Sequence, residues 1–184
     1  GRHVARIAKG FEMNILAFDI NQDKKFAKKL GFSYFSLEEL LRNSDVISLH
    51  IPYNKDTHHL LNSNNINLIK KGAYLINTAR GGVVETTSII KALDEGIIAG
   101  AGLDVLEEEY FIKEELQLLS SKFNPKYVFK TMLQNHVLME QENVIITPHN
   151  AFNSSEALKR ILETTVQNIK SFIKDKPINL VSSL

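Results

Sequence analysis

Three polar side chains in this sequence follow apolar runs and could bind an anion and move a proton. Arg80 follows "AYLI" within "NTARGG", Glu109 follows "GLDV", and His149 follows "NVIIT" within "TPHN". A guanidinium can hold an anion with two parallel hydrogen bonds, and an imidazole titrating near ~6.5 can transfer a proton around neutral pH. A carboxylate beside the imidazole favours its charged form and fixes its orientation. Together these residue types suggest a site for acid–base chemistry on a small anionic molecule.

Each of these residues also has a plainer interpretation. A loop arginine is often solvated or makes an ordinary surface pair, and a histidine at a strand end often has a structural role. The three acids Glu107, Glu108 and Glu109 are adjacent, and spacing alone does not separate them. We expect Glu107 and Glu108 to be solvated neighbours. The functional interpretation depends on all three side chains meeting at one edge of one sheet.

The elements that would position these residues alternate regularly between strand and helix. Apolar runs predict strands at 14–19, 45–52, 73–76, 98–105 and 143–149, with a weak strand at 33–35. Helical spacing or capping signals predict helices at the chain start and over 22–31, 36–44, 64–71 and 85–95, with a long final helix after 153. Such alternation predicts an α/β fold with a single parallel sheet. In such sheets the carboxyl ends of the strands form the ligand crevice.

Two helix starts carry capping signatures, and one long segment interrupts the alternation. Ser36 with Glu39, and Asn153 with Glu156, have the spacing of a capping box. The segment Glu107–Gln141 is predicted to contain helices around 113–121 and 128–140. Connections this long are usually functional. It could form a subunit interface or shield the active site, and the alternative is a surface decoration without consequence.

Composition limits the possible functions. The 184 residues suit one domain, and the formal charge of +1 gives no indication of a nucleic-acid or membrane-surface partner. The absence of cysteine excludes disulfides and thiolate metal sites, and we predict no metal site. No apolar run approaches the length of a membrane span, and no signal peptide is apparent. A cytoplasmic protein with a small-molecule partner is expected.

Asp19 is a candidate for binding a nucleotide ribose. It closes a strand 18 residues after Gly1, and a ribose-binding acid lies about 20 residues beyond the glycine-rich turn of a dinucleotide site. Gly1 would then be the third glycine of that turn. A carboxylate accepts hydrogen bonds from two ribose hydroxyls and repels a 2′-phosphate, so NAD would be preferred over NADP. The alternative is that Asp19 only caps or forms a turn.

Several spaced motifs in order resemble the D-isomer-specific 2-hydroxyacid dehydrogenase family, particularly its D-lactate dehydrogenase-like members. They are "GRHVARIAKGF", "LAFD", "SDVISLHIPYNKDTHHLLN", "KKGAYLINTARGGVVE", "AGLDVLEEE" and "NVIITPHNAF", and they cover nearly the whole chain. The resemblance implies a Rossmann-like doubly wound parallel sheet that binds NAD. It also implies that Arg80, Glu109 and His149 are catalytic. The implied NAD-site residues are Gly1, Asp19, Ile51, Pro52, Thr57, Thr78, Ala79, Arg80 and Asp104, the last near the nicotinamide.

The implied reaction interconverts a 2-keto acid and a D-2-hydroxy acid and gives each residue a role. Arg80 would clamp the substrate carboxylate and polarise the ketone, and His149, paired with Glu109, would donate the proton. Gly81 and Gly82 would let backbone and cofactor come close. D-Lactate and pyruvate are the expected pair. Glyoxylate, 3-phosphoglycerate, glycerate and branched 2-keto acids are alternatives, and an NAD-sensing corepressor-like module without turnover is another.

The chain also departs from the family pattern. The first strand and the first two glycines of the dinucleotide motif are missing, as is most of the separate substrate domain, so residues 1–184 are expected to form a partial NAD-binding domain. We expect negligible turnover and weak NAD binding from this polypeptide alone, because the pyrophosphate cradle is incomplete. The resemblance further implies a homodimer that pairs through the nucleotide-binding domain.

Overall fold

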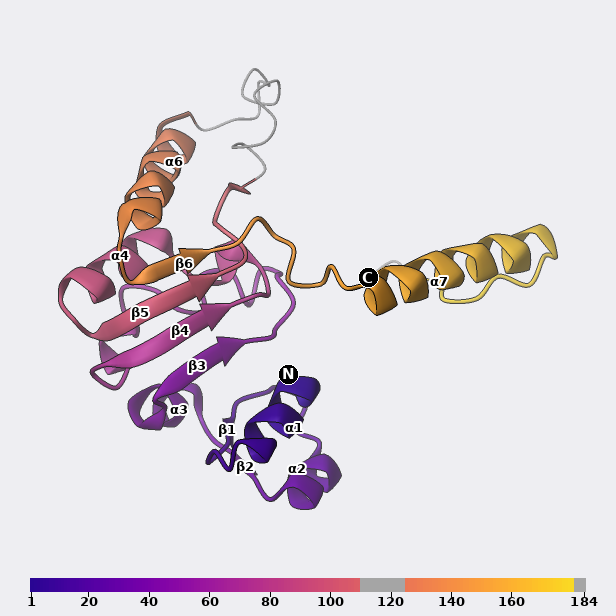
Figure 1. Cartoon of the computed structure of the whole chain (residues 1–184), viewed down its shortest axis with the longest axis horizontal. Helices are drawn as coiled ribbons and strands as arrows, with labels where there is room; N and C mark the ends of the chain where they lie inside the picture. The colour runs from indigo at the N-terminus through magenta and orange to yellow at the C-terminus, as the bar shows by residue number, and fades with distance from the viewer. Residues whose placement is uncertain (110–124, 181–184) are drawn as a thin grey trace. The chain divides into compact units, whose positions relative to one another are not determined.

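The computed structural model describes residues 1–109 and 125–180 (Figure 1). The chain forms two compact units. The first unit is Gly1–Pro148 and the second is His149–Leu184. Within the described residues, no helix has both the length and the apolar character that crossing a membrane would require.

The first unit is built on a four-stranded parallel sheet, so the predicted α/β class is confirmed. Its strands are β3 (Val46–Leu49), β4 (Ala73–Asn77), β5 (Ile98–Leu103) and β6 (Val144–Ile146), in the order β3-β4-β5-β6. The register pairs Leu49 with Asn77, Asn77 with Leu103 and Leu103 with Ile146. The carboxyl ends of all four strands are therefore level at one edge, where ligands bind in sheets of this kind.

The prediction of one continuous sheet was wrong in one respect. Strands β1 (Leu16–Ala17) and β2 (Ser33–Tyr34) pair with each other in parallel as a separate two-stranded sheet. Each has only two residues, so each offers few backbone groups for a ladder. The run expected over 14–19 is shortened because Asp19 accepts a hydrogen bond from the Asn21 backbone N–H at 2.8 Å and turns the chain.

The helices follow the predicted alternation. The structure contains α1 (Arg2–Gly10), α2 (Lys24–Leu30), α3 (Leu37–Asn43), α4 (Thr86–Asp94), α6 (Pro125–Glu140) and α7 (Ser155–Ile173). Short 3-10 turns form at η1 (Ile66–Leu68) and η2 (Gly81–Val83). The helix expected over 64–71 is thus only the η1 turn, and the helix predicted at 113–121 lies outside the described residues.

Helix starts are set by local hydrogen bonds that the sequence largely reveals. Ser36 and Glu39 form the predicted capping box at α3. The prediction for α7 was off by one residue, because Ser154 rather than Asn153 has the extended cap conformation and accepts from the Ala157 N–H at 3.2 Å. A cap requires both a side-chain acceptor and extended backbone.

The hydrophobic core of the first unit lies between the sheet and its helices. Helix α4 packs against α6 and β5, and α6 also contacts β6. Fully buried members include Leu41, Leu75, Ile98 and Leu138. In the second unit the predicted long final helix forms as α7, and its apolar side chains, such as Phe172, are exposed.

Candidate functional site at the carboxyl edge of the sheet

Asn77, the last residue of β4, shapes the turn that carries Arg80. Its side chain is 1% exposed, its amide donates to the Arg80 carbonyl at 3.0 Å, and its carbonyl oxygen accepts from the Ala79 N–H at 3.0 Å. The Arg80 side chain is exposed, and its Nη1 donates to the Ala79 carbonyl at 2.6 Å. The motif "NTARGG" did not by itself predict this role of Asn77. The available signal was an asparagine at a strand-to-turn junction.

The two glycines after Arg80 permit close packing, as predicted for the backbone. A Cβ on Gly81 would lie 2.1 Å from the Leu106 carbonyl atoms, and a Cβ on Gly82 would lie 2.7 Å from the Tyr53 ring. No larger residue fits either contact without displacement of its neighbour. The neighbours seen here are protein segments, and the approach of a cofactor to these glycines stays a prediction.

Asp104 joins the ends of three strands. Its side chain is 4% exposed, its N–H donates to the Asn77 carbonyl at 2.9 Å, and its Oδ1 accepts from the Thr147 hydroxyl at 2.5 Å. Glu109 is partly buried and its Oε2 accepts from the Leu106 N–H at 3.2 Å. The segment Asp104–Glu109 therefore leaves β5 at the same edge as the Arg80 turn.

Glu107 is buried, so the expectation that it is a solvated neighbour was wrong. It is 5% exposed, and its carboxylate accepts hydrogen bonds from His59 Nε2 at 2.5 Å, Tyr127 Oη at 2.6 Å and Thr86 Oγ1 at 2.7 Å. The Thr86 N–H donates to the same carboxylate at 3.1 Å. A buried carboxylate is tolerated when hydrogen bonds replace its lost hydration. Glu108 is partly exposed, which is closer to the solvated side chain that the sequence predicted for it.

The electrostatics follow from this network. Burial alone would raise the pKa of Glu107, but the hydrogen bonds from Tyr127, Thr86 and His59 outweigh it and lower the pKa. Burial and the hydrogen bond to Glu107 raise the pKa of Tyr127. Burial, with the negative charge of Glu107, raises the pKa of Glu108. The fold therefore stabilises the ionised form of Glu107 and disfavours that of Glu108.

The residues expected to hold a dinucleotide all belong to the first unit. A Cβ on Gly1, at the N-terminus of α1, would lie 3.5 Å from the His50 Cβ, just past β3. Asp19 is exposed while forming its turn, so both interpretations of this acid remain compatible with the fold.

The loop after β3 is folded by its own polar groups. The Thr57 hydroxyl donates to the Pro52 carbonyl at 2.7 Å and accepts from the Asn54 N–H at 2.8 Å. Ile51 is partly buried and Pro52 is exposed at the strand end. Thr78 and Ala79 follow β4 at the same edge. Asp19 is exposed and Gly1 precedes the first turn of α1, and groups of these two kinds can bind a ribose and a phosphate.

His149 begins the second unit, three residues after β6 ends. It is partly buried and has a left-handed backbone, with φ of 55°. Arg80, Asp104 and Glu109 all belong to the first unit. The structure thus brings the arginine turn and the acidic segment to one sheet edge, and the convergence of His149 with them stays a prediction.

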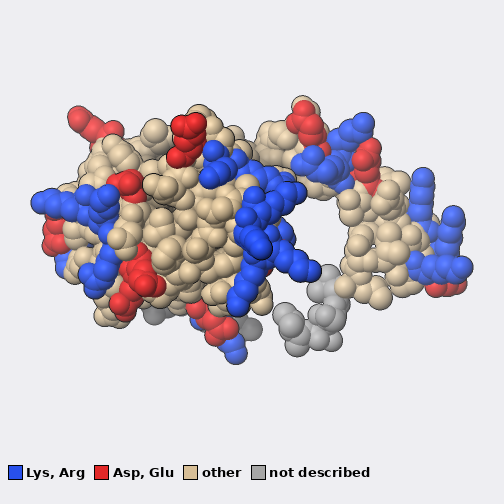
Figure 2. Space-filling view, turned by 90° about the horizontal axis from the view of Figure 1, so that it is seen from below, with Lys and Arg blue, Asp and Glu red and all other residues tan. Residues whose placement is uncertain are grey.

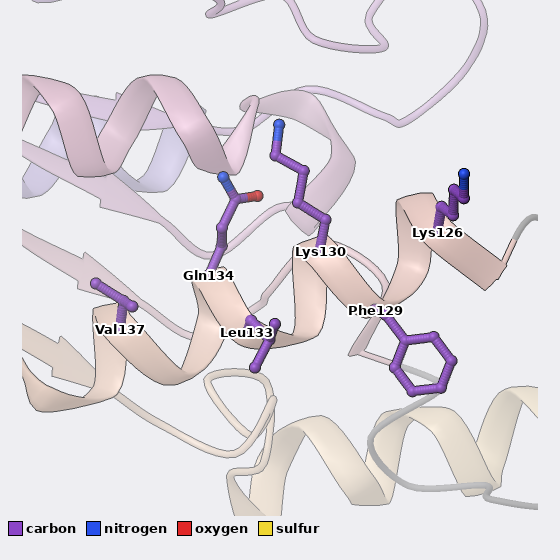
Figure 3. A pocket seen from close by; sticks show the side chains of 6 residues that line it. All are labelled: Lys126, Phe129, Lys130, Leu133, Gln134 and Val137. Atoms are coloured by element: carbon purple, nitrogen blue, oxygen red, sulfur yellow. The ribbon is translucent and has the colours of Figure 1, made fainter.

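Two further surface features lie on helices. A hollow of about 600 Å³ runs along α6, where Phe129 points away from Lys130 and Gln134 (Figure 3). Lysines and arginines of α1 and α2 gather on one face (Figure 2), and the Arg2 guanidinium lies 4.3 Å from the centre of the Phe26 ring. The net charge of the whole chain is only +1, so this concentration of positive charge is confined to the surface of α1 and α2.

Comparison with known proteins identifies close relatives. A family model described as "D-isomer specific 2-hydroxyacid dehydrogenase, NAD binding domain" matches residues 1–151. Glyoxylate reductase of Thermococcus litoralis is 39% identical over 183 residues, which are 99% of this chain and 49% of that protein. A D-specific alpha-keto acid dehydrogenase of Enterococcus faecium is 36% identical over 94% of this chain and 49% of its own. The chain thus spans about half the length of these curated relatives.

Solved structures give the same result. The crystal structure of D-lactate dehydrogenase from Aquifex aeolicus, complexed with NAD and lactic acid, has a TM-score of 0.82 and 41% identity, and the match covers 96% of this chain and 51% of that one. The apo-structure of D-lactate dehydrogenase from Escherichia coli has a TM-score of 0.76 and 34% identity over 97% of this chain and 49% of that one. The predicted Rossmann-like fold is therefore confirmed.

Proposed function

The chain belongs to the D-isomer specific 2-hydroxyacid dehydrogenase family, and on this basis we propose that residues 1–184 are the NAD-binding domain of an NAD-dependent oxidoreductase. The enzyme interconverts a 2-keto acid and a D-2-hydroxy acid. The observation that carries this proposal is the junction at the sheet edge, where Asn77 binds both the Arg80 carbonyl and the Asp104 N–H. It holds the anion-binding turn beside the acidic segment.

The nucleotide is held along the carboxyl edge of the strands. Asp19 accepts the ribose hydroxyls, the N-terminus of α1 at Gly1 faces phosphate, and Asp104 lies toward the nicotinamide. Further contacts come from residues at the strand ends, namely Ile51, Pro52, Thr57, Thr78, Ala79 and Arg80. NADH, when bound, supplies the hydride for ketone reduction.

Arg80 binds the substrate carboxylate and polarises the neighbouring ketone. A planar guanidinium matches a carboxylate with two parallel hydrogen bonds, which a lysine cannot reproduce. Its side chain is exposed at the end of β4, so it is available to an anion in the crevice. The carboxylate of the substrate thereby fixes the orientation of the carbonyl carbon.

His149 donates the proton to the ketone oxygen, and Glu109 orients the imidazole. A carboxylate beside an imidazole favours its protonated form, which ketone reduction consumes. In the reverse direction the neutral imidazole accepts the hydroxyl proton. Glu109 is presented for this role by the segment that leaves β5.

The substrate is a short 2-keto acid. The relatives are described as a glyoxylate reductase, a D-specific alpha-keto acid dehydrogenase and D-lactate dehydrogenases, all of which act on this class. Pyruvate and D-lactate are the first pair to test, and glyoxylate is the second. We further infer a cytoplasmic homodimer that pairs through this domain, with the exposed apolar residues of α6 in the contact.

The test is an assay of His149→Ala in a polypeptide of the relatives' full length that contains residues 1–184. With NADH and a panel of 2-keto acids, kcat should fall by about 10²–10⁴-fold, because general acid catalysis contributes that much. NADH affinity, followed by fluorescence, should stay within about twofold of the unchanged protein, since the imidazole acts on the substrate.

Two results would contradict the proposal. One is a wild-type protein that oxidises NADH with none of the 2-keto acids. The other is a variant whose turnover matches wild type. A preference for NADPH over NADH would contradict the role given to Asp19 while leaving the reaction class in place.

A further inference from the structure

Glu107 joins three segments that are far apart in the sequence. His59 lies in the loop after β3, Thr86 begins α4, and Tyr127 lies in α6, and all three donate hydrogen bonds to its carboxylate. The backbone of Glu107 is held as well, since the Asn135 side chain donates to its carbonyl at 2.8 Å. Both the side chain and the main chain of one residue are therefore fixed from several sides.

The same contacts reach the turn that carries Arg80. The His59 N–H donates to the Gly82 carbonyl at 2.8 Å, and Gly81 packs directly on the backbone of Leu106 and Glu107. Thr86 lies just beyond this turn and donates twice to Glu107. The Arg80 turn is thus tied to Glu107 through both His59 and Thr86.

We propose that Glu107 is a positioning residue that holds the Arg80 turn and the Asp104–Glu109 segment in their relative placement. This inference rests on the proposed function, because it assigns catalytic roles to Arg80 and Glu109. Glu107 itself touches no reacting atom. It acts through the turn that carries the substrate clamp Arg80 and the segment that carries Glu109, which orients the proton donor, and small errors in such placement cost much of the rate.

The chemistry of the network requires a carboxylate. Oε1 accepts from His59 and Tyr127, and Oε2 accepts from the Thr86 N–H and hydroxyl. An ionised carboxylate accepts at both oxygens, whereas the carboxamide of glutamine accepts at one and donates at the other. Glu107→Gln therefore preserves the size of the side chain. Its NH₂ group, however, faces either the His59 and Tyr127 donors or the two Thr86 donors. His59, facing a pure acceptor, must carry a proton on Nε2.

The first test is amide hydrogen exchange on the 184-residue chain, with Glu108→Gln as the matched control. Glu107→Gln should accelerate exchange at least tenfold for amides of 81–86 and 104–109, with β3 and β4 unchanged. Glu108→Gln removes the same charge one residue away and should leave these amides unchanged. Tyr127→Phe deletes one of the hydrogen-bond donors to Glu107 and should give a smaller acceleration of exchange at the same amides. If Glu107→Gln does not fold, Tyr127→Phe is the variant that tests the inference.

The second test is kinetic and uses the full-length polypeptide. Glu107→Gln should lower kcat at least tenfold while NADH affinity and the KM for NADH stay within twofold, and Glu108→Gln should match wild type. Unchanged exchange in these segments, acceleration spread equally over the sheet, or an unchanged kcat would each overturn the inference. If wild type reduces no 2-keto acid, the proposed function fails, and the exchange data still decide whether Glu107 holds the two segments together.

Discussion

At the scale of single residues, the site depends on two buried polar side chains, Asn77 and Glu107, that each make several hydrogen bonds. Asn77 uses its amide nitrogen and oxygen to fold one turn, and the Glu107 carboxylate accepts four hydrogen bonds. An unpartnered buried carboxylate would be costly, and charge-assisted hydrogen bonds reverse that cost. The pKa of Glu107 is lowered because its hydrogen bonds stabilise the ionised form by more than burial destabilises it.

This balance predicts a pH-dependent effect of Glu107→Gln on stability. Because folding lowers the pKa of Glu107 below its usual value of 4.5, its contribution is complete above about pH 4.5 and is lost as the pH falls through the folded-state value. The variant should melt roughly 5 °C below wild type at pH 7, from the loss of charge-assisted hydrogen bonds. Calorimetric melting temperatures measured from pH 7 to pH 3 should converge. A gap that stays constant to pH 3 would contradict an ionised Glu107.

At the scale of elements, the strand ends are brought together by close backbone packing. Strands β3 to β6 end level with one another, and the η2 turn at Gly81–Val83 lies directly against the segment after β5. Such contact requires that one partner have no side chain. The two glycines after Arg80 therefore let the Arg80 turn lie against the Leu106–Glu107 backbone and the Tyr53 ring.

Gly81→Ala should accordingly destabilise the chain, whereas Gly10→Ala should not. A Cβ at position 81 would meet the Leu106 backbone at 2.1 Å, and overpacking of this kind costs about 1–3 kcal/mol. At Gly10, the last residue of α1, a Cβ would meet no described atom within 4 Å, and alanine favours the helix by up to ~1 kcal/mol. Urea unfolding would measure both. Equal stability of the two variants would show that the turn shifts freely.

At the scale of the whole molecule, each unit presents apolar surface on a helix. On α6 the exposed apolar residues include Phe129, Leu133 and Val137, and Leu133 is 70% exposed. On α7 they include Ile161 and Phe172. Apolar patches of this kind are typical of contact surfaces.

The proposed homodimer predicts that Leu133→Asp yields a monomer. A charge at the centre of a buried apolar contact is unfavourable without a partner, so the dimer should dissociate at micromolar concentration. Light scattering coupled to size-exclusion chromatography gives the mass directly, and Phe172→Asp on α7 is the control. A monomeric wild type would refute the dimer, and dissociation by the α7 variant instead would move the contact to that helix.

The sequence by itself determined the α/β class and the family, whereas the tertiary structure decided which acid is buried. Alternating apolar runs and the Ser36–Glu39 box depend on near neighbours, so their outcome is encoded locally. Local sequence patterns do not distinguish which of the three adjacent glutamates is buried. Only folding brings Thr86, 21 positions away, and His59, 48 positions away, against Glu107, and a buried charge is settled by such distant donors.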